Sequence, residues 1–160
     1  ALYIKKLIEE GYTEIKRQRR NHMKTIAVID GKGGGVGSAL IGRLKKEVPQ
    51  AHVLALGTNA LATSAMLRAG ADDGATGENA IVQCCGRAHV VAGPIGILMA
   101  GAMLGEVSAP MAAAVGQSPG QRVLIPNHKS GIHVCGVGEA PLSQYIEEAA
   151  LYIKKLIEEE

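Results

Sequence analysis

The segment from Lys24 to Ile41 constrains the fold of this chain more than any other. An apolar run ends at Asp30, and five glycines then fall within residues 31–37. The apolar positions that follow recur with the spacing of one helix face. The segment therefore predicts a buried strand, a tight glycine-rich turn and the N-terminus of a helix.

Such a turn favours anion binding. Glycine has no Cβ to keep a ligand from the backbone, and the N–H groups and dipole of a helix N-terminus attract negative charge. We predict that a phosphate group contacts the loop and the first helical turn, at Gly33, Gly34, Gly35, Val36, Gly37 and Ser38. The alternative interpretation is that the glycines only allow the strand and the helix to pack closely.

Known glycine motifs fit this loop imperfectly. A dinucleotide pattern G-x-G-x-x-G that starts at Gly31 has Val36 in place of its third glycine, and no lysine precedes Ser38 as a P-loop requires. A variant P-loop nucleotide hydrolase would need Lys32 to replace that lysine and Asp30 to bind magnesium. This hydrolase is our third functional hypothesis.

Composition supports an α/β fold. The 160 residues include no Trp or Phe and many small aliphatic side chains, which suit a parallel sheet covered by helices. Strand and helix patterns alternate along the chain, so we predict a Rossmann-like, doubly wound, mostly parallel five-stranded sheet with terminal amphipathic helices. The expected parallel strands are 24–30, 52–56, 88–92 and 122–125, followed by an antiparallel edge strand at 132–137. A buried helix is expected at 97–104, between the third and the fourth parallel strand.

Charge and cysteine content exclude several functional classes. The net charge of +2 comes from the basic cluster at 16–20, and without aromatic residues to stack on bases this cluster does not predict nucleic-acid binding. The longest apolar stretch, 90–104, is too short to span a membrane. Cys84, Cys85 and His89 lack the spacing of a metal site. We expect a cytoplasmic protein with no metal.

The two ends of the chain carry the same decapeptide. Residues 1–10 recur letter for letter at 150–159, whereas diverged repeats normally span whole supersecondary units. With Met23 as the natural start, we interpret residues 1–22 as an appended helix, 23–149 as the Rossmann-like domain and 150–160 as an appended continuation of the last helix, both additions being engineered. We expect a homo-oligomer that assembles through these helices. A non-catalytic structural scaffold is the alternative function.

Several short phrases occur in a recognisable order. They are Ile29-Asp-Gly-Lys-Gly-Gly-Gly-Val-Gly37, Ala55-Leu-Gly-Thr-Asn59, Ala62-Thr-Ser-Ala-Met66, Ala75-Thr-Gly-Glu-Asn-Ala80, Gly93-Pro94 and Gly105-Glu106. On these phrases residues 24–148 resemble a small uncharacterised bacterial family, domain-of-unknown-function family three-eight-four-two. The resemblance implies a Rossmann-like single domain and brings no known activity.

Ligands of doubly wound sheets bind beyond the carboxyl ends of the strands. That rule gathers a crevice from Asp30, Gly33 to Gly37, Thr58, Asn59, Gly93, Pro94, Asn127 and His128. We predict a nucleotide or other phosphate-bearing small ligand, with a dinucleotide as one option, and with Thr58 and Asn59 on its ribose or base. The candidates for acid–base chemistry are Asp30, Glu78 and His128.

Overall fold

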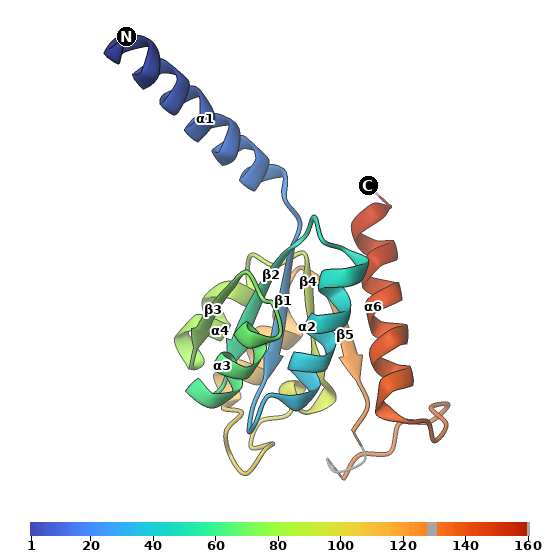
Figure 1. Ribbon diagram of the computed structural model, residues 1–160. Coiled ribbons are helices and arrows are strands. Elements are labelled where there is room, and N and C mark those ends of the chain that lie inside the picture. Colours follow the sequence, from blue (N-terminus) through green and yellow to red (C-terminus); the bar gives the residue numbers. More distant parts are fainter. Residues whose placement is uncertain (128–130, 160) are drawn as a thin grey trace.

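The computed structural model describes residues 1–127 and 131–159, without the side chains of residues 19–22. It contains one sheet of five parallel strands with helices on both faces (Figure 1). The strands are β1 (Thr25–Asp30), β2 (His52–Gly57), β3 (Asp73–Thr76), β4 (Val90–Pro94) and β5 (Gln121–Ile125). Their order across the sheet is β3-β2-β1-β4-β5. The predicted α/β fold class is confirmed.

Helices connect the strands and cover the sheet. They are α1 (Leu2–His22), α2 (Gly35–Glu47), α3 (Ala60–Arg68), α4 (Glu78–Cys85), α5 (Ala109–Gln117) and α6 (Leu142–Glu158), with a 3-10 helix η1 (Ile95–Leu98). Helices α2, α3 and α6 share one hydrophobic cluster with the sheet. Helices α4 and α5 share a second cluster on the opposite face. The chain therefore winds first to one side of β1 and then to the other.

Strand β1 is central because it is apolar on both faces. Ile26 and Val28 belong to the first cluster, whereas Ala27 and Ile29 belong to the second. All four side chains are buried, as expected for a parallel strand between two helical layers. The strand pairs with β2 from Thr25 to Asp30 and with β4 from Ile26 to Val28. Asp30 is thereby held at the carboxyl edge of the sheet.

The predicted antiparallel edge strand is wrong. Within the described residues, 131–140 form no strand, and Gly131 and Gly136 have positive φ values of 70° and 85°, which an extended strand does not allow. The fifth strand is instead β3, at the other edge and parallel to β2. The pattern of Asp73–Thr76 does not indicate a strand, because glycine and aspartate are rare in strands.

The predicted buried helix at 97–104 is also wrong. The chain forms η1 and then a series of turns from Met99 to Val107, in which Gly101, Met103, Leu104 and Gly105 have positive φ. A helix cannot pass through residues in this left-handed conformation. The segment instead leaves the sheet and forms a wall beside the loop that follows β1.

The two copies of the decapeptide have different environments. In α6, Ile153 and Ile157 are buried against the first cluster, and Lys154 Nζ lies 3.6 Å from Glu47 Oε2 of α2. In α1, the equivalent Ile4 and Ile8 are 61% and 66% exposed. Helix α1 projects away from the body of the protein (Figure 1). One copy therefore packs on the domain, and the other has an uncovered apolar face.

Candidate functional site

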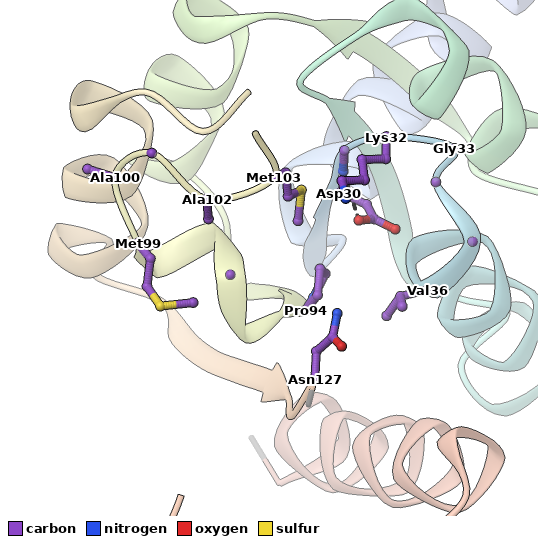
Figure 2. A pocket seen from close by; sticks show the side chains of 15 residues that line it. Asp30, Lys32, Gly33, Val36, Pro94, Met99, Ala100, Ala102, Met103 and Asn127 are labelled. Carbon is purple, nitrogen blue, oxygen red and sulfur yellow. Dashed lines mark hydrogen bonds between the residues drawn. The ribbon is translucent and has the colours of Figure 1, made fainter. Parts of the chain in front are cut away.

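A cavity of about 610 Å³ lies beyond the carboxyl ends of β1 and β4. The strand order reverses between these two strands, and this switch point is where doubly wound sheets bind ligands. The cavity is lined by Asp30, Gly31, Lys32, Gly33, Gly34, Gly35, Val36, Pro94, Gly96, Met99, Ala100, Gly101, Ala102, Met103 and Asn127. Figure 2 shows the loop and α2 on one side of the space and the segment from Met99 to Met103 on the other.

The glycines of the loop differ in whether the structure requires glycine at their positions. Gly34 caps α2 with φ 72°, and a Cβ there would lie 2.9 Å from the Ala62 carbonyl oxygen. Neither Gly33 nor Gly35 has a positive φ, and a Cβ on either would meet nothing within 4 Å. Among Gly33, Gly34 and Gly35, backbone conformation and packing therefore require glycine at position 34 only, and the bare backbone at 33 and 35 faces open space.

The backbone N–H groups of the loop are partly engaged. Gly34 N–H donates to the Gly31 carbonyl at 2.9 Å, and Gly37 N–H donates to Asp30 Oδ2 at 2.7 Å. Among the described residues, the N–H groups of Gly33 and Gly35 have no acceptor. These two groups are the donors that the loop can offer to a ligand.

Asp30 lies underneath the loop and is 4% exposed. Its Oδ1 accepts from Gly31 N–H at 2.8 Å, and its Oδ2 accepts from Gly37 N–H. Burial raises the pKa of the Asp30 carboxyl, backbone donors at Gly37, Gly31 and Val36 oppose that shift, and the nearby Glu106 charge adds to it. Both oxygens thus hold the loop in shape, which leaves them poorly placed to bind the magnesium ion that the hydrolase hypothesis needs.

Glu106 is a member of the site that sequence reasoning missed. Its Oε2 accepts from Lys32 N–H at 2.6 Å and from Thr58 Oγ1 at 2.8 Å. The Asn59 side-chain amide donates to both Glu106 oxygens, at 3.1 and 3.2 Å. These donors, the Lys32 N–H first, hold the pKa of the Glu106 carboxyl below its usual value. Glu106 therefore ties the segment after η1 to the loops that follow β1 and β2.

The opposite wall of the cavity is apolar and strained. Met99 and Met103, which fall in the segment predicted as a buried helix, line the cavity. Met103 and Leu104 both have φ 57°, a conformation that costs non-glycine residues of the order of 1–3 kcal/mol. Leu104 is 96% exposed. Strain of this kind concentrates at functional sites, so this segment belongs to the candidate site.

The cavity brings together some of the predicted site residues. Those on its wall are Asp30, Gly33, Gly34, Gly35, Val36 and Pro94, together with Asn127 from the crevice. Those away from its wall are Gly37, Ser38, Thr58, Asn59, Glu78 and Gly93. Gly93 instead allows β4 to approach Ile29, because a Cβ there would collide with the Ile29 carbonyl oxygen. His128 lies outside the described residues.

The two polar residues that we predicted on a ribose or base already have hydrogen-bond partners within the protein. Thr58 and Asn59, which we predicted to contact a ribose or base, are engaged by Glu106, and Asn59 also caps α3 through a 2.8 Å bond from Ala62 N–H. Ser38 Oγ is buried, and within the described part of the chain it has no hydrogen-bond partner. The predicted phosphate contact of Ser38 is untested and stays a prediction.

Among residues 1–127 and 131–159, no group of three or more His, Cys, Asp or Glu side chains could hold a metal ion. Burial raises the pKa of the Cys85 thiol to about 11. No described helix is both long and apolar enough to cross a bilayer.

Comparison with solved structures gives α/β proteins of low similarity. One is a dodecameric FMN-dependent Ubix-like decarboxylase from Escherichia coli O157:H7, with 20% identity, a TM-score of 0.44, and coverage of 84% of this chain and 76% of that one. Another is AibC, with 16% identity, a TM-score of 0.42, and coverage of 84% of this chain and 40% of that one. No curated protein matches the chain.

A family model, Domain of unknown function (DUF3842), matches residues 25–158. The match begins at β1 and runs through α6, so it includes nine of the ten residues of the C-terminal decapeptide and leaves out the N-terminal copy. The glycine-rich loop, the cavity and Glu106 all lie within the matched region. The chain therefore belongs to the DUF3842 family.

Proposed function

We propose that this protein binds a nucleotide or another phosphate-bearing small molecule in the cavity over the glycine-rich loop. The observation that carries the proposal is the coincidence of three features at one place. The cavity lies at the switch point of the sheet, its wall contains Gly33 and Gly35, whose N–H groups donate to none of the described residues, and a Cβ on either residue would project into open space.

The chemistry of the cavity suits a ligand with two parts. Unengaged N–H groups before the N-terminus of α2 favour an anionic group. The wall formed by Pro94, Met99 and Met103 offers apolar and sulfur contacts to an uncharged ring. A volume of about 610 Å³ falls within the range of small-molecule sites. A phosphate ester of a ring compound therefore matches both walls.

The Asp30 carboxylate modifies this proposal. Because it accepts the Gly37 N–H, this N–H is not available to the phosphate of a ligand. The ligand's phosphate would instead approach from the cavity side, at the N–H groups of Gly33 and Gly35. In this arrangement, Gly34, Val36, Gly37 and Ser38 would not contact the phosphate directly.

Ligand binding can be tested by thermal unfolding with NAD, NADP, FAD, ATP, GTP and inorganic phosphate. A ligand at a hundredfold excess over its dissociation constant stabilises the fold by about 2.7 kcal/mol, which for a chain of this size raises the midpoint by about 5–10 °C. Isothermal titration calorimetry of any ligand that shifts the midpoint would then give its affinity.

Gly35→Asp is the decisive variant. The new carboxylate would lie in the first turn of α2, where it is compatible with the helix dipole, so the fold should persist while an anion is repelled. Gly42→Asp is the matched control, because Gly42 lies two turns further along α2 and a Cβ there also meets nothing within 4 Å. Loss of the shift in Gly35→Asp alone supports the proposal. Equal shifts in both variants, or no shift with any ligand, would refute it.

A further inference from the structure

A cluster of hydrogen-bond donors beside the cavity is occupied by a carboxylate of the protein itself. Four hydrogen bonds from three residues converge on the Glu106 carboxylate, and their donors are Lys32 N–H, Thr58 Oγ1 and the Asn59 amide. We call this set of donors the anion seat. The donors come from the loops after β1 and β2, whereas the carboxylate comes from the distant segment after η1.

Gly31 makes room for an anion in the seat. A Cβ at this position would lie 2.6 Å from Glu106 Oε2, from Thr58 Oγ1 and from Met103 Sδ. The φ of Gly31 is not positive, so its backbone conformation does not itself require glycine. Glycine at position 31 is therefore explained by the space that the Glu106 carboxylate, the Thr58 hydroxyl and the Met103 sulfur occupy together.

The donors are held in place without help from Glu106. The Asn59 side chain is oriented by its bond from Ala62 N–H and by its own donation to the Lys32 carbonyl at 2.9 Å. The Thr58 backbone N–H donates to the Asp30 carbonyl at 3.0 Å. Preorganised donors of this kind keep their arrangement when the acceptor changes.

We propose that the anion seat is a binding position for the carboxylate or phosphoryl group of a small molecule, and that Glu106 fills it as an internal substitute for that group. Glu106 is partly exposed, so rotation of its side chain would free the seat. Gly31 and Lys32 also line the cavity, so a ligand anchored in the seat would extend into the cavity. The inference rests on the proposed function and narrows its ligand to a molecule with an oxyanion group at this position.

The test removes the internal carboxylate and supplies one from solution. Glu106→Ala is titrated with sodium acetate and, separately, with inorganic phosphate, and the Lys32 backbone amide and the Asn59 side-chain amide are followed by ¹⁵N–¹H correlation spectra. We expect saturable shifts of both resonances in the variant at concentrations that leave the wild-type spectrum unchanged. Tighter acetate binding would indicate a carboxylate ligand, and tighter phosphate binding a phosphoryl ligand.

Two additional variants test the geometry of the seat. Hydrogen bonds to charged groups are worth about 1.5–3 kcal/mol, so adding Thr58→Val to Glu106→Ala should weaken anion binding about tenfold to a hundredfold. Adding Gly31→Ala should abolish it, because the new methyl group fills the seat. Anion binding that neither change affects would overturn the inference.

Glu106→Gln guards against loss of folding in the alanine variant. Glutamine keeps the size of the side chain and one acceptor for Lys32 N–H but loses the charge, so it should compete with acetate less well than Glu106 does. We expect it to bind acetate more tightly than the wild type. Folded Glu106→Ala or Glu106→Gln protein that titrates no differently from the wild type would overturn the inference.

The outcomes also separate this inference from the proposed function. If a nucleotide stabilises the wild type and Gly35→Asp removes the effect, while Glu106→Ala shows no acetate shift, the function stands and the seat does not. If acetate binds Glu106→Ala at Lys32 and Asn59 while no phosphate compound stabilises the wild type, the seat stands and the proposed ligand class is wrong.

Discussion

Adjacent glycines in the loop after β1 have opposite requirements. Gly34 has a left-handed backbone and a close contact with Ala62, whereas Gly35 has neither. An alanine at position 34 would meet both the conformational cost and the collision, but an alanine at position 35 would only reduce the freedom of the unfolded chain. Within the glycine run, the structure thus requires glycine at position 34 but not at position 35.

This difference predicts opposite changes in stability. Gly34→Ala should lower the free energy of unfolding by more than 1 kcal/mol, and Gly35→Ala should raise it by about 0.4–1 kcal/mol. Urea denaturation followed by circular dichroism measures both. Equal destabilisation by the two variants would contradict the assigned roles.

The Glu106 carboxylate predicts a pH dependence of stability. Its pKa in the folded protein lies below the ordinary value of 4.5, chiefly because of the Lys32 N–H, so its contribution is complete above the unfolded pKa and is lost as the pH falls through the folded pKa. The difference in unfolding free energy between the wild type and Glu106→Gln should therefore be largest above about pH 5 and shrink below pH 4.5.

Denaturation at several pH values between about 3 and 7 checks this prediction. Asp30 has a pKa shift of the opposite sign; its largest cause, burial, is the same in both proteins, whereas the smaller part that comes from the Glu106 charge is lost in Glu106→Gln. A difference between the two proteins that is constant across this range would show that Glu106 is not stabilised as an anion.

At this scale the sequence predicted the loop well and its partners poorly. The glycine count and the spacing after Asp30 identified the cavity residues from Gly33 to Val36, because strand, turn and helix signals are local. Glu106 could not be found in this way, since it meets Lys32 across a long sequence separation. The signal that was present, Gly105-Glu106 after an apolar run, indicated only a turn.

A comparison of helices α1 and α6 distinguishes the effect of local sequence on helix stability from the effect of tertiary packing. Their shared decapeptide is helical in both places, but only the α6 copy is covered by α2 and the sheet. Intrinsic helix propensity is therefore the same for the two copies, and tertiary contacts supply the rest of the stability of α6. The chain contains its own control for a packing experiment.

Ile153→Ala and Ile4→Ala form that matched pair. Ile153 is fully buried and Ile4 is 61% exposed. Truncation of a buried isoleucine typically costs about 2–5 kcal/mol, whereas exposed changes usually stay within about 0.5 kcal/mol. Denaturation of the two variants at low protein concentration should show this contrast. Similar losses would mean that α1 packs on the domain in solution.

Element by element, sequence patterns predicted β1, β2, β4, β5 and most helices. They failed where composition contradicts the local structure. Strand β3 is short, lies at an edge and contains Asp73 and Gly74, so it has the composition of a loop and depends on pairing with β2. The 132–137 segment has the alternation of a strand, but Gly136 within it and Gly131 before it have positive φ values, which an extended strand does not allow.

At the scale of the whole molecule, the apolar face of α1 predicts self-association. Within the described residues, its large hydrophobic side chains are all exposed, and the groove that fits the decapeptide is already filled by residues 150–158 of the same chain. Each additional chain adds one such groove, which its own C-terminal decapeptide fills. The apolar faces of the α1 helices therefore have only each other to pack against. This supports the predicted homo-oligomer through terminal helices.

Removal of residues 1–22 should therefore lower the number of chains per particle in solution, as measured by sedimentation or light scattering. In the full chain, Ile8→Glu on the apolar face should have the same effect, whereas Thr13→Glu on the opposite face should not. An unchanged number of chains per particle after removal of residues 1–22 would show that α1 does not drive assembly. The scaffold hypothesis would then depend on contacts of the domain itself.

Because all five strands run in the same direction, the cavity and the attachment of α1 are at opposite ends of the sheet. Helix α1 joins the amino end of β1, and the C-terminal end of α6 lies on the same side of the molecule (Figure 1). Protein coupled to a sensor surface through either terminus would therefore present an open cavity to the solution, and immobilised chains could be screened for ligands without blocking the site.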